Sequence, residues 1–433
     1  MTPLAIGLIG IGILVILIFS RMPIGFVMAL VGFGGFVYLT NFDAGLGILR
    51  VVSYGTFADY NLSVVPLFIL MGSLCFFAGI TKDLYDTVHT WLGQMPGGLA
   101  IATVGACACF AALSGSSIAT AATIGTMALP EMKRYQYDDR LATGSVAAGG
   151  TLGILIPPSV PLILYAIITE QSIGKLFLAG FIPGILQALL YMVTIYILCK
   201  RNPLIGPRGP RTNFKQKMGS LKNMWVVLLL FLLVIGGIYL GVFSPTEAAG
   251  VGAFGAFAFA LLRGRLDWKA FKSSLFESGG TTAMLFVILL GAMILGYFLA
   301  VSRVPFELSS MVAGMPASRY VIISLILAVY IFFGCIMDSL AIMLLITPIF
   351  FPVIKTLGFD PIWFGIMVTR VTEIGLITPP VGLNVYVISG IAKDVPMQQI
   401  FRGIGPFLVA DAFHVALLIA IPQLSLFLPG FMK

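Results

Sequence analysis

Long apolar runs constrain this chain more than any other feature of its sequence. Leu4–Phe19, Trp225–Val242 and Phe407–Ile421 are examples, and such runs approach the roughly 20 residues that a helix needs to cross a hydrocarbon core. Only 10% of the residues are charged, whereas a soluble domain carries about 25%. The runs are continuous rather than alternating, which argues against a β-barrel. The sequence therefore predicts an all-α polytopic membrane protein.

A basic linker, 201–223, divides the chain near its midpoint. The stretch Lys200–Asn223 holds seven Lys or Arg residues and no acidic residue. Because basic loops lie on the cytoplasmic side, we place the linker inside. The topology then starts outside and puts 18 of the 25 Lys and Arg residues on inside flanks. Ten spans are predicted, near 4–20, 23–40, 62–80, 141–169, 176–198, 224–243, 246–262, 280–300, 361–391 and 405–421.

Two further segments, 97–131 and 320–353, have both ends on one side of the predicted membrane. Each is either a pair of tight spans or a re-entrant hairpin. The run Ser114–Ser117 at the centre of the first segment favours a hairpin that turns inside the protein. Small residues at such a tip let the backbone approach an ion closely, and exposed carbonyl and hydroxyl oxygens suit a hard cation such as Na⁺. The alternative is a small-residue helix-packing face.

An internal repeat relates the two halves at a constant sequence offset of 222. The alignment needs no gap from 110 to 184. An odd number of spans per half makes the second copy inverted, and inverted repeats with interrupted helices are typical of secondary transporters. The alternative is a duplicated structural membrane protein. The matched pairs are Pro157-Pro158 with Pro379-Pro380, Gly153 with Gly375, Pro130 with Pro352, Asp138 with Asp360, Ser117 with Ser339, Phe110 with Phe332, and Pro23 with Pro245.

Both halves interrupt a predicted span with glycine and proline, at 149–159 and at 372–384. Such segments cannot continue a regular helix, and unpaired carbonyls at membrane depth are tolerated only inside protein or beside a cavity. A simple proline kink is the alternative. The second break is the more polar, since Arg370 and Glu373 lie within the span. At positions i and i+3 they can pair on one helix face, and such a pair could simply brace the break. The functional alternative is that Arg370 helps to bind an anionic solute.

Asp338, at the tip of the second hairpin, aligns with Ser116 of the first. A buried carboxylate there could bind Na⁺ or carry a proton, or it could only cap the following helix.

The sequence lacks the motifs of several other functions. The sequence has no phosphate-cradling motif for ATP, no nucleophile–base set that would make an enzyme, no cluster of metal-ligand spacing, and no basic stripe for nucleic acid.

These motifs resemble the large membrane subunit of tripartite ATP-independent periplasmic (TRAP) transporters, and the resemblance covers the whole chain. It is carried in the first half by Ser114-Gly-Ser-Ser, by Pro130-Glu-Met and by Gly153-Ile-Leu-Ile-Pro-Pro-Ser. In the second half it is carried by Gly334-Cys-Ile-Met-Asp-Ser and by Glu373-Ile-Gly-Leu-Ile-Thr-Pro-Pro-Val-Gly-Leu-Asn. We see no clear departure from the family pattern.

The resemblance implies Na⁺-driven import of an organic acid anion, such as sialic acid or a C4-dicarboxylate, across the bacterial inner membrane. It implies two partners, which are a small membrane subunit expected as a separate chain and a periplasmic solute-binding protein. It also implies an elevator-type fold with scaffold parts 1–80 and 224–300, and transport parts 81–200 and 301–433.

More than one Na⁺ is expected, each between a hairpin tip and the break that follows it. The solute contacts that we predict are Arg370, Glu373, Asn384 and Ser159. The residues predicted for Na⁺ are Ser114, Gly115, Ser116, Ser117, Gly149, Thr151, Gly153 and Pro157 in the first half, and Gly334, Asp338, Ser339, Thr372, Gly375, Thr378 and Pro379 in the second.

Other functions fit the same pattern less well. A self-sufficient carrier of the same superfamily would need neither partner. A channel could line its pore with the two breaks, but two inverted hairpins suit alternating access better. An intramembrane enzyme is the weakest alternative, since the sequence offers no catalytic set.

Overall fold

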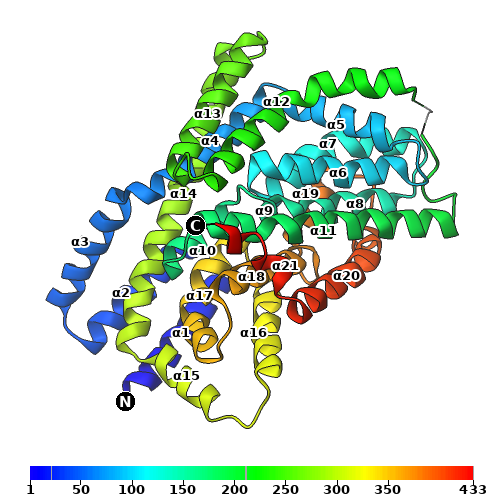
Figure 1. Cartoon of the computed structure of the whole chain (residues 1–433). Coiled ribbons are helices and arrows are strands. Elements are labelled where there is room, and N and C mark those ends of the chain that lie inside the picture. Colours follow the sequence, from blue (N-terminus) through cyan, green and yellow to red (C-terminus); the bar gives the residue numbers. More distant parts are fainter. Residues whose placement is uncertain (21, 210–211, 433) are drawn as a thin grey trace.

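The computed structural model describes residues 1–20, 22–209 and 212–432, which form helices joined by loops, with no strand among them. Arg21, Arg211 and Lys433, whose charges enter the predicted topology, lie outside the described residues, as does Pro210 of the predicted linker. Within the described part the chain is all-α, as predicted. Figure 1 shows the helices in chain order.

Polar N-caps set where many helices of the first half begin. Ser116 and Asp138, for example, accept backbone N–H groups at the starts of α7 and α8, which satisfies donors that a helix start leaves free. The helices are α1 (Pro3–Phe19), α2 (Ile24–Leu39), α3 (Phe42–Ala58), η1 (Tyr60–Ser63), α4 (Val64–Phe77), α5 (Ile80–Leu92), α6 (Gly98–Ser114), α7 (Ser117–Arg134), α8 (Asp139–Gly150), α9 (Leu152–Leu155), α10 (Val160–Thr169) and α11 (Ile173–Arg201).

The second half uses the same chemistry. Ser244 and Glu247 form a reciprocal capping box at the start of α13, and Asp360 caps α18, which matches Asp138 at the offset of 222. The helices are α12 (Phe214–Tyr239), α13 (Pro245–Leu262), α14 (Trp268–Val301), α15 (Val304–Ala313), α16 (Arg319–Gly334), α17 (Ser339–Thr356), α18 (Pro361–Ile377), α19 (Leu383–Ile391), α20 (Met397–Ala420), α21 (Gln423–Leu426) and η2 (Pro429–Phe431).

The same sequence offset relates helix boundaries. Both ends of α17 match those of α7 at the offset of 222, and so does the start of α18 relative to α8. One difference is the long α14, which occupies the positions of α3, η1 and α4. In the first half Asp59 accepts from Asn61 N–H and turns the chain, and Pro66 follows. The positions equivalent to Asn61 and Pro66 hold Ala283 and Ile288, which continue a helix.

Seven helices of the described residues are long and apolar enough to cross a membrane, or eight if the bent α12 counts as one span. Shorter apolar helices, including α1, α2, α6 and α16, add to these. The seven segments are Tyr60–Phe77, Asp139–Thr169, Ile173–Arg201, Pro245–Leu262, Trp268–Val301, Ser339–Thr356 and Met397–Ala420.

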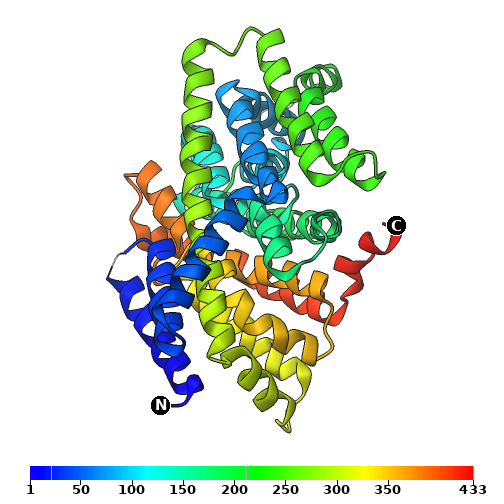
Figure 2. The same cartoon turned by 90° about the vertical axis from the view of Figure 1, so that its left-hand side faces the viewer.

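Helices of the two halves pack against each other at close range. α2 lies along α14, and Figure 2 shows the blue N-terminal helices beside the long α14. A side chain on Gly25 would come within 2.8 Å of the Val287 carbonyl oxygen. α8 lies along α20 in the same way, and a side chain on Gly144 would reach within 2.5 Å of the Gly403 carbonyl oxygen. Glycine therefore permits backbone contact at both inter-half seams, as small residues do between membrane helices.

Candidate functional site

The first hairpin is the pair α6 and α7, and its tip lies against the break between α9 and α10. Gly115 forms the turn with φ +58°, a conformation that glycine adopts at little cost. A side chain there would meet the Pro158 carbonyl oxygen at 3.0 Å. A side chain on Gly153 would likewise come within 2.5 Å of the Ser116 carbonyl oxygen. The tip and the break therefore touch through backbone.

Polar groups at this first tip find partners nearby. Ser114 Oγ lies 2.7 Å from Thr120 Oγ1, Ser116 caps α7, and Ser159 caps α10 through Leu162 N–H. Thr151 Oγ1 donates to the Ala148 carbonyl and lies 3.3 Å from Tyr191 Oη. Two of the predicted Na⁺ residues lie apart from the tip contact. They are Gly149, which faces Cys107 of α6, and Pro157, which begins the buried cis Pro157-Pro158 pair.

The second hairpin, α16 and α17, meets the break between α18 and α19 at the equivalent place. The Cys335 carbonyl accepts from Val381 N–H at 3.3 Å and from Gly382 N–H at 3.4 Å. Gly334 and Gly375 meet backbone to backbone, so that a side chain on Gly334 would lie 3.0 Å from the Gly375 Cα. Thus Gly375, like Gly153 at the offset of 222, is the contact point of the helix before the break.

Two predicted polar residues of this second unit, Asp338 and Thr378, have local hydrogen-bond partners. Asp338 Oδ2 accepts from Leu340 N–H at 3.2 Å and caps α17, so the capping interpretation of this carboxylate is observed. Ser339 is buried in the first turn of the same helix. Thr378 Oγ1 donates to the Ile374 carbonyl at 2.5 Å, directly before the cis Pro379-Pro380 pair.

A buried polar cluster joins the first hairpin to the second break. Ser117 Oγ donates to Glu373 Oε2 at 2.8 Å, and Asn384 Nδ2 donates to Ser117 Oγ at 2.8 Å. Ser117 is 2% exposed, and the other two are fully buried. Our sequence prediction placed each site within its own half and did not anticipate this link.

Oxygen atoms around this cluster have no hydrogen-bond partner among the described residues. They are Glu373 Oε1, Asn384 Oδ1 and Thr372 Oγ1. The ion pairs of the described part do not include Glu373. A buried carboxylate without a compensating charge is costly, and carboxylate, amide and hydroxyl oxygens are the ligands that a hard cation takes. The residues present therefore fit Na⁺ by their chemistry.

Arg370 belongs to a second buried network, on the α20 side of α18. Its guanidinium forms an ion pair with Asp411, and Arg370 Nε donates to His414 Nδ1 at 3.1 Å. Asp411 Oδ1 also accepts from Gln187 Nε2 and from Tyr191 Oη, both at 2.6 Å. This network holds α11, α18 and α20 together.

The pairing of Arg370 with Glu373, one of the alternatives that the sequence left open, does not form. Although they lie three residues apart on α18, the two side chains go to different neighbours, Arg370 to α20 and Glu373 to the first hairpin tip. Each finds a hydrogen-bond partner in another helix, Asp411 for Arg370 and Ser117 for Glu373, and those tertiary contacts replace the local one. With 1% exposure, Arg370 is committed to Asp411 in this conformation.

Sequence reasoning missed four residues of the Arg370 network, because it treated Phe407–Ile421 as a purely apolar run. An acidic residue within an apolar span is itself a functional signal. Asp411 and His414 are the polar residues of this kind, three residues apart in that run. Their network also includes Gln187 and Tyr191 of α11. The missed residues are Gln187, Tyr191, Asp411 and His414.

Interrupted helices that meet hairpin tips around buried polar atoms are typical of membrane transport proteins. The fold is similar to that of a solved structure, the YdaH transporter of Alcanivorax borkumensis, which superposes with a TM-score of 0.66 at 12% identity, over 88% of this chain and 90% of that one. The family described as tripartite ATP-independent periplasmic transporter, DctM component, matches residues 11–424. The chain belongs to this family, which confirms the resemblance seen in the sequence.

Two relatives illustrate the range of the family. A C4-dicarboxylate TRAP transporter large permease protein of Pseudomonas aeruginosa is 39% identical over 385 residues, which is 89% of this chain and 90% of the relative. A sialic acid TRAP transporter large permease protein of Vibrio cholerae is 34% identical over 414 residues, which is 95% of this chain and 96% of the relative.

Proposed function

We propose that this chain is the large permease of a Na⁺-coupled secondary transporter that imports an organic acid anion across the bacterial inner membrane. The observation that carries the proposal is the Glu373 carboxylate, which is buried without a basic partner beside a hairpin tip. Family membership supplies the transport class. The names of the relatives support a C4-dicarboxylate or sialic acid as the solute, and they support a small membrane subunit and a periplasmic binding protein as partners.

Electrostatics would order the steps at this site. A bare carboxylate in a buried site repels an anionic solute, and it attracts a cation. Binding of Na⁺ by the Glu373, Asn384 and Thr372 oxygens would neutralise the site, so the anion would bind well only afterwards. Na⁺ binding would also affect the first hairpin tip, because Ser117 is hydrogen-bonded to both Glu373 and Asn384.

Movement of the site is the second part of the proposal. Helix boundaries that match at the offset of 222 support two repeats, and inverted repeats with broken helices are typical of alternating access. We place the hairpins and broken helices in the moving part and the α2–α14 seam in the scaffold. The Arg370–Asp411 network would keep the moving part rigid, since it joins α11, α18 and α20.

Reconstitution tests the proposal. The chain, with its small subunit, is placed in liposomes, and uptake of labelled succinate and of labelled sialic acid is measured with and without the cognate binding protein. We expect uptake of one of the two only with an inward Na⁺ gradient and the binding protein. Equal uptake when K⁺ replaces Na⁺, or uptake by the chain alone, contradicts the proposal, and conductance far above carrier turnover would identify a channel.

A further inference from the structure

A groove lies between α5, α6, α11 and α12, and none of its lining residues belongs to the Glu373 cluster. Its volume is about 530 Å³. Among the described residues that line it, Thr87 is the one with a hydroxyl group, and that hydroxyl already donates to the Asp83 and Ser220 carbonyls. The other lining residues are apolar or small, for example Ala108, Met192 and Phe231. The groove thus offers a ligand apolar contact and no polar atom in need of a partner.

The lip of this groove is apolar and partly exposed. Ile185, Leu189 and Leu228, which line it, are 42%, 52% and 44% exposed. The groove also extends inward to Ile156, at the start of the first break. An exposed apolar opening of this kind faces hydrocarbon in a membrane protein, and it admits a long, thin apolar group from the side.

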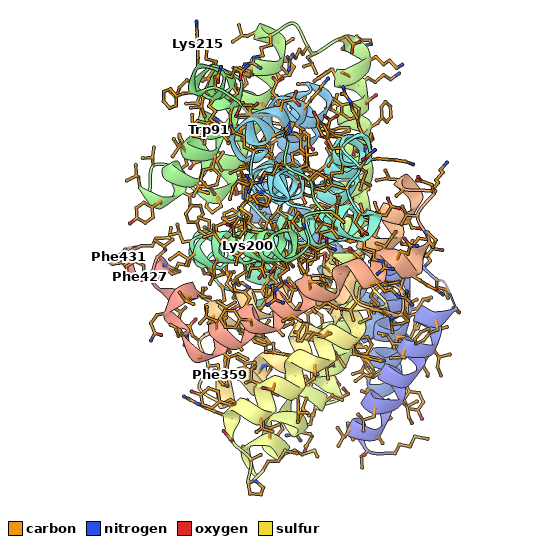
Figure 3. All side chains as sticks on the ribbon, turned by 90° about the vertical axis from the view of Figure 1, so that its right-hand side faces the viewer. Trp91, Lys200, Lys215, Phe359, Phe427 and Phe431 are labelled. Atoms are coloured by element: carbon orange, nitrogen blue, oxygen red, sulfur yellow. The ribbon has the colours of Figure 1, made fainter. Side chains whose placement is uncertain are left out.

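Basic residues lie at one end of the groove. The first part of α12, Phe214–Lys222, precedes a bend of 54° and carries Lys215, Lys217 and Lys222. Trp91 Nε1, from the groove lining, donates to the Lys217 carbonyl at 3.1 Å, and Lys217 Nζ lies 5.9 Å from the centre of the Trp91 ring. Figure 3 shows Trp91 and Lys215 at the same end of the molecule.

These three lysines are free to bind an anion. The ion pairs of the described residues involve Lys133, Arg263, Arg265 and Arg370, and none of the three α12 lysines. Lys215 and Lys222 are exposed and Lys217 is half-buried. Their segment is the last part of the linker 201–223, which the positive-inside rule places on the cytoplasmic side, where anionic lipid headgroups concentrate.

We propose that the groove is a binding site for one anionic phospholipid, with an acyl chain along the groove and the phosphate at the end where Lys217 lies, in the positive field to which Lys215 and Lys222 add. The charge complementarity selects this occupant, because an apolar channel that ends at unpaired lysines and an indole matches a lipid tail, a phosphate and the interfacial place of tryptophan. A partner helix would match the lysines only if it carried an acidic residue at this end of the groove.

Native mass spectrometry tests the lipid site in a way that does not need transport activity. The delipidated full chain, with its small subunit, is titrated with phosphatidylglycerol and with phosphatidylcholine of the same acyl chains. We expect phosphatidylglycerol to bind at least about tenfold more tightly at low salt, with a preference that falls as salt rises. Equal affinity for the two lipids overturns the proposal.

Paired variants locate the site. The triple change Lys215→Gln, Lys217→Gln and Lys222→Gln should remove the preference for phosphatidylglycerol. The matched control removes three exposed lysines elsewhere on the predicted cytoplasmic side, Lys269→Gln, Lys272→Gln and Lys393→Gln, and should keep the preference. If both sets behave alike, the headgroup site is refuted.

A groove-filling change tests the acyl chain. Cys109→Phe should weaken both lipids, whereas Leu232→Phe on the exposed face of α12 should weaken neither. If Cys109→Phe instead releases the small subunit and leaves lipid binding unchanged, a protein helix occupies the groove and the proposal fails. The lysine variants change two exposed residues and one half-buried residue outside the groove lining, so they keep the proposal testable even if Cys109→Phe does not fold.

Discussion

The two hairpin–break units have similar backbones and different side-chain chemistry. In both, the helix before the break contacts the hairpin tip through a glycine, Gly153 or Gly375. The first unit satisfies its hydroxyl groups locally, as Ser114 does with Thr120. The second leaves Glu373, Asn384 and Thr372 with unpartnered oxygens. The comparison teaches that a shared backbone sets the shape, while the charged chemistry belongs to one half.

The differences are visible position by position. At the offset of 222, Glu373 corresponds to Thr151, Asn384 to Leu162 and Asp338 to Ser116. The Arg370–Asp411 ion pair corresponds to Ala148 and Leu189. The first half nevertheless contributes to the second site, because Ser117 hydrogen-bonds to both Glu373 and Asn384.

The largest effect on stability should come from breaking the Arg370–Asp411 ion pair, which has no counterpart at the matched positions of the first half. Asp411→Ala leaves Arg370 charged and buried, and removing one partner of a buried pair typically costs about 3–5 kcal/mol. We expect a marked fall in the thermal unfolding midpoint of the purified protein. Leu189→Ala, at the matched and half-exposed position of the first half, should change the midpoint little. Similar midpoints for the two variants would show that the pair does not brace α18 against α20.

The next effect concerns Glu373 itself. Glu373→Gln keeps the shape and can still accept from Ser117, but it removes the negative charge that we assign to Na⁺ binding. We expect the Na⁺ concentration for half-maximal uptake to rise at least about tenfold, since charge-assisted contacts are the stronger ones. Stabilisation of the protein by Na⁺ against heat should weaken as well. Glu277→Gln, at an exposed position of α14, is the control, and an unaltered Na⁺ response in Glu373→Gln would remove the carboxylate from the coupling site.

Substitutions at Asp338 and Ser116 can distinguish helix capping from ion binding, because both residues cap the second helix of a hairpin. Ser116→Ala and Asp338→Ala should each cost about 1 kcal/mol of stability through the lost cap. Asp338→Asn keeps a good capping residue and removes the charge. If Asp338 also binds Na⁺, as we predict, Asp338→Asn should reduce the Na⁺ dependence of uptake at nearly normal stability. A normal Na⁺ dependence in this variant would leave Asp338 as a cap only.

Much of the fold was predictable because its signals are local. Proline, glycine and capping residues end or start a helix wherever they stand, so the breaks at 156–159 and 378–382 and the tips at 115–116 and 335–338 follow from the nearby sequence. The site was only partly predictable. Glu373, Asn384 and Ser117 were all named, but the contact between the halves depends on how distant helices pack. Asp411 escaped notice because apolar neighbours on both sides masked a single carboxylate.

The smallest effect is expected at the exposed pair between Lys133 of α7 and Asp394 in the loop after α19. The matched lysine, Lys355, instead lies 4.6 Å from the Phe351 ring centre, and the position matching Asp394 is Ser172, the cap of α11. The pair therefore joins the two halves without being repeated. Exposed ion pairs contribute little to stability, so Lys133→Gln should shift the unfolding midpoint no more than Lys355→Gln does.

A pH titration sharpens this last comparison. The Lys133 ammonium, through its hydrogen bond, holds the pKa of the Asp394 carboxyl below its ordinary value, which is about 3.9. A carboxyl whose pKa is lower in the folded state contributes its stability above the unfolded pKa and loses it as the pH falls through the folded pKa. The free energy of unfolding of Lys133→Gln should therefore differ slightly from that of the parent protein at neutral pH. The difference should vanish below the pKa of Asp394 in the folded state. A difference between the two proteins that grows on acidification would show that Lys133 acts on some group other than Asp394.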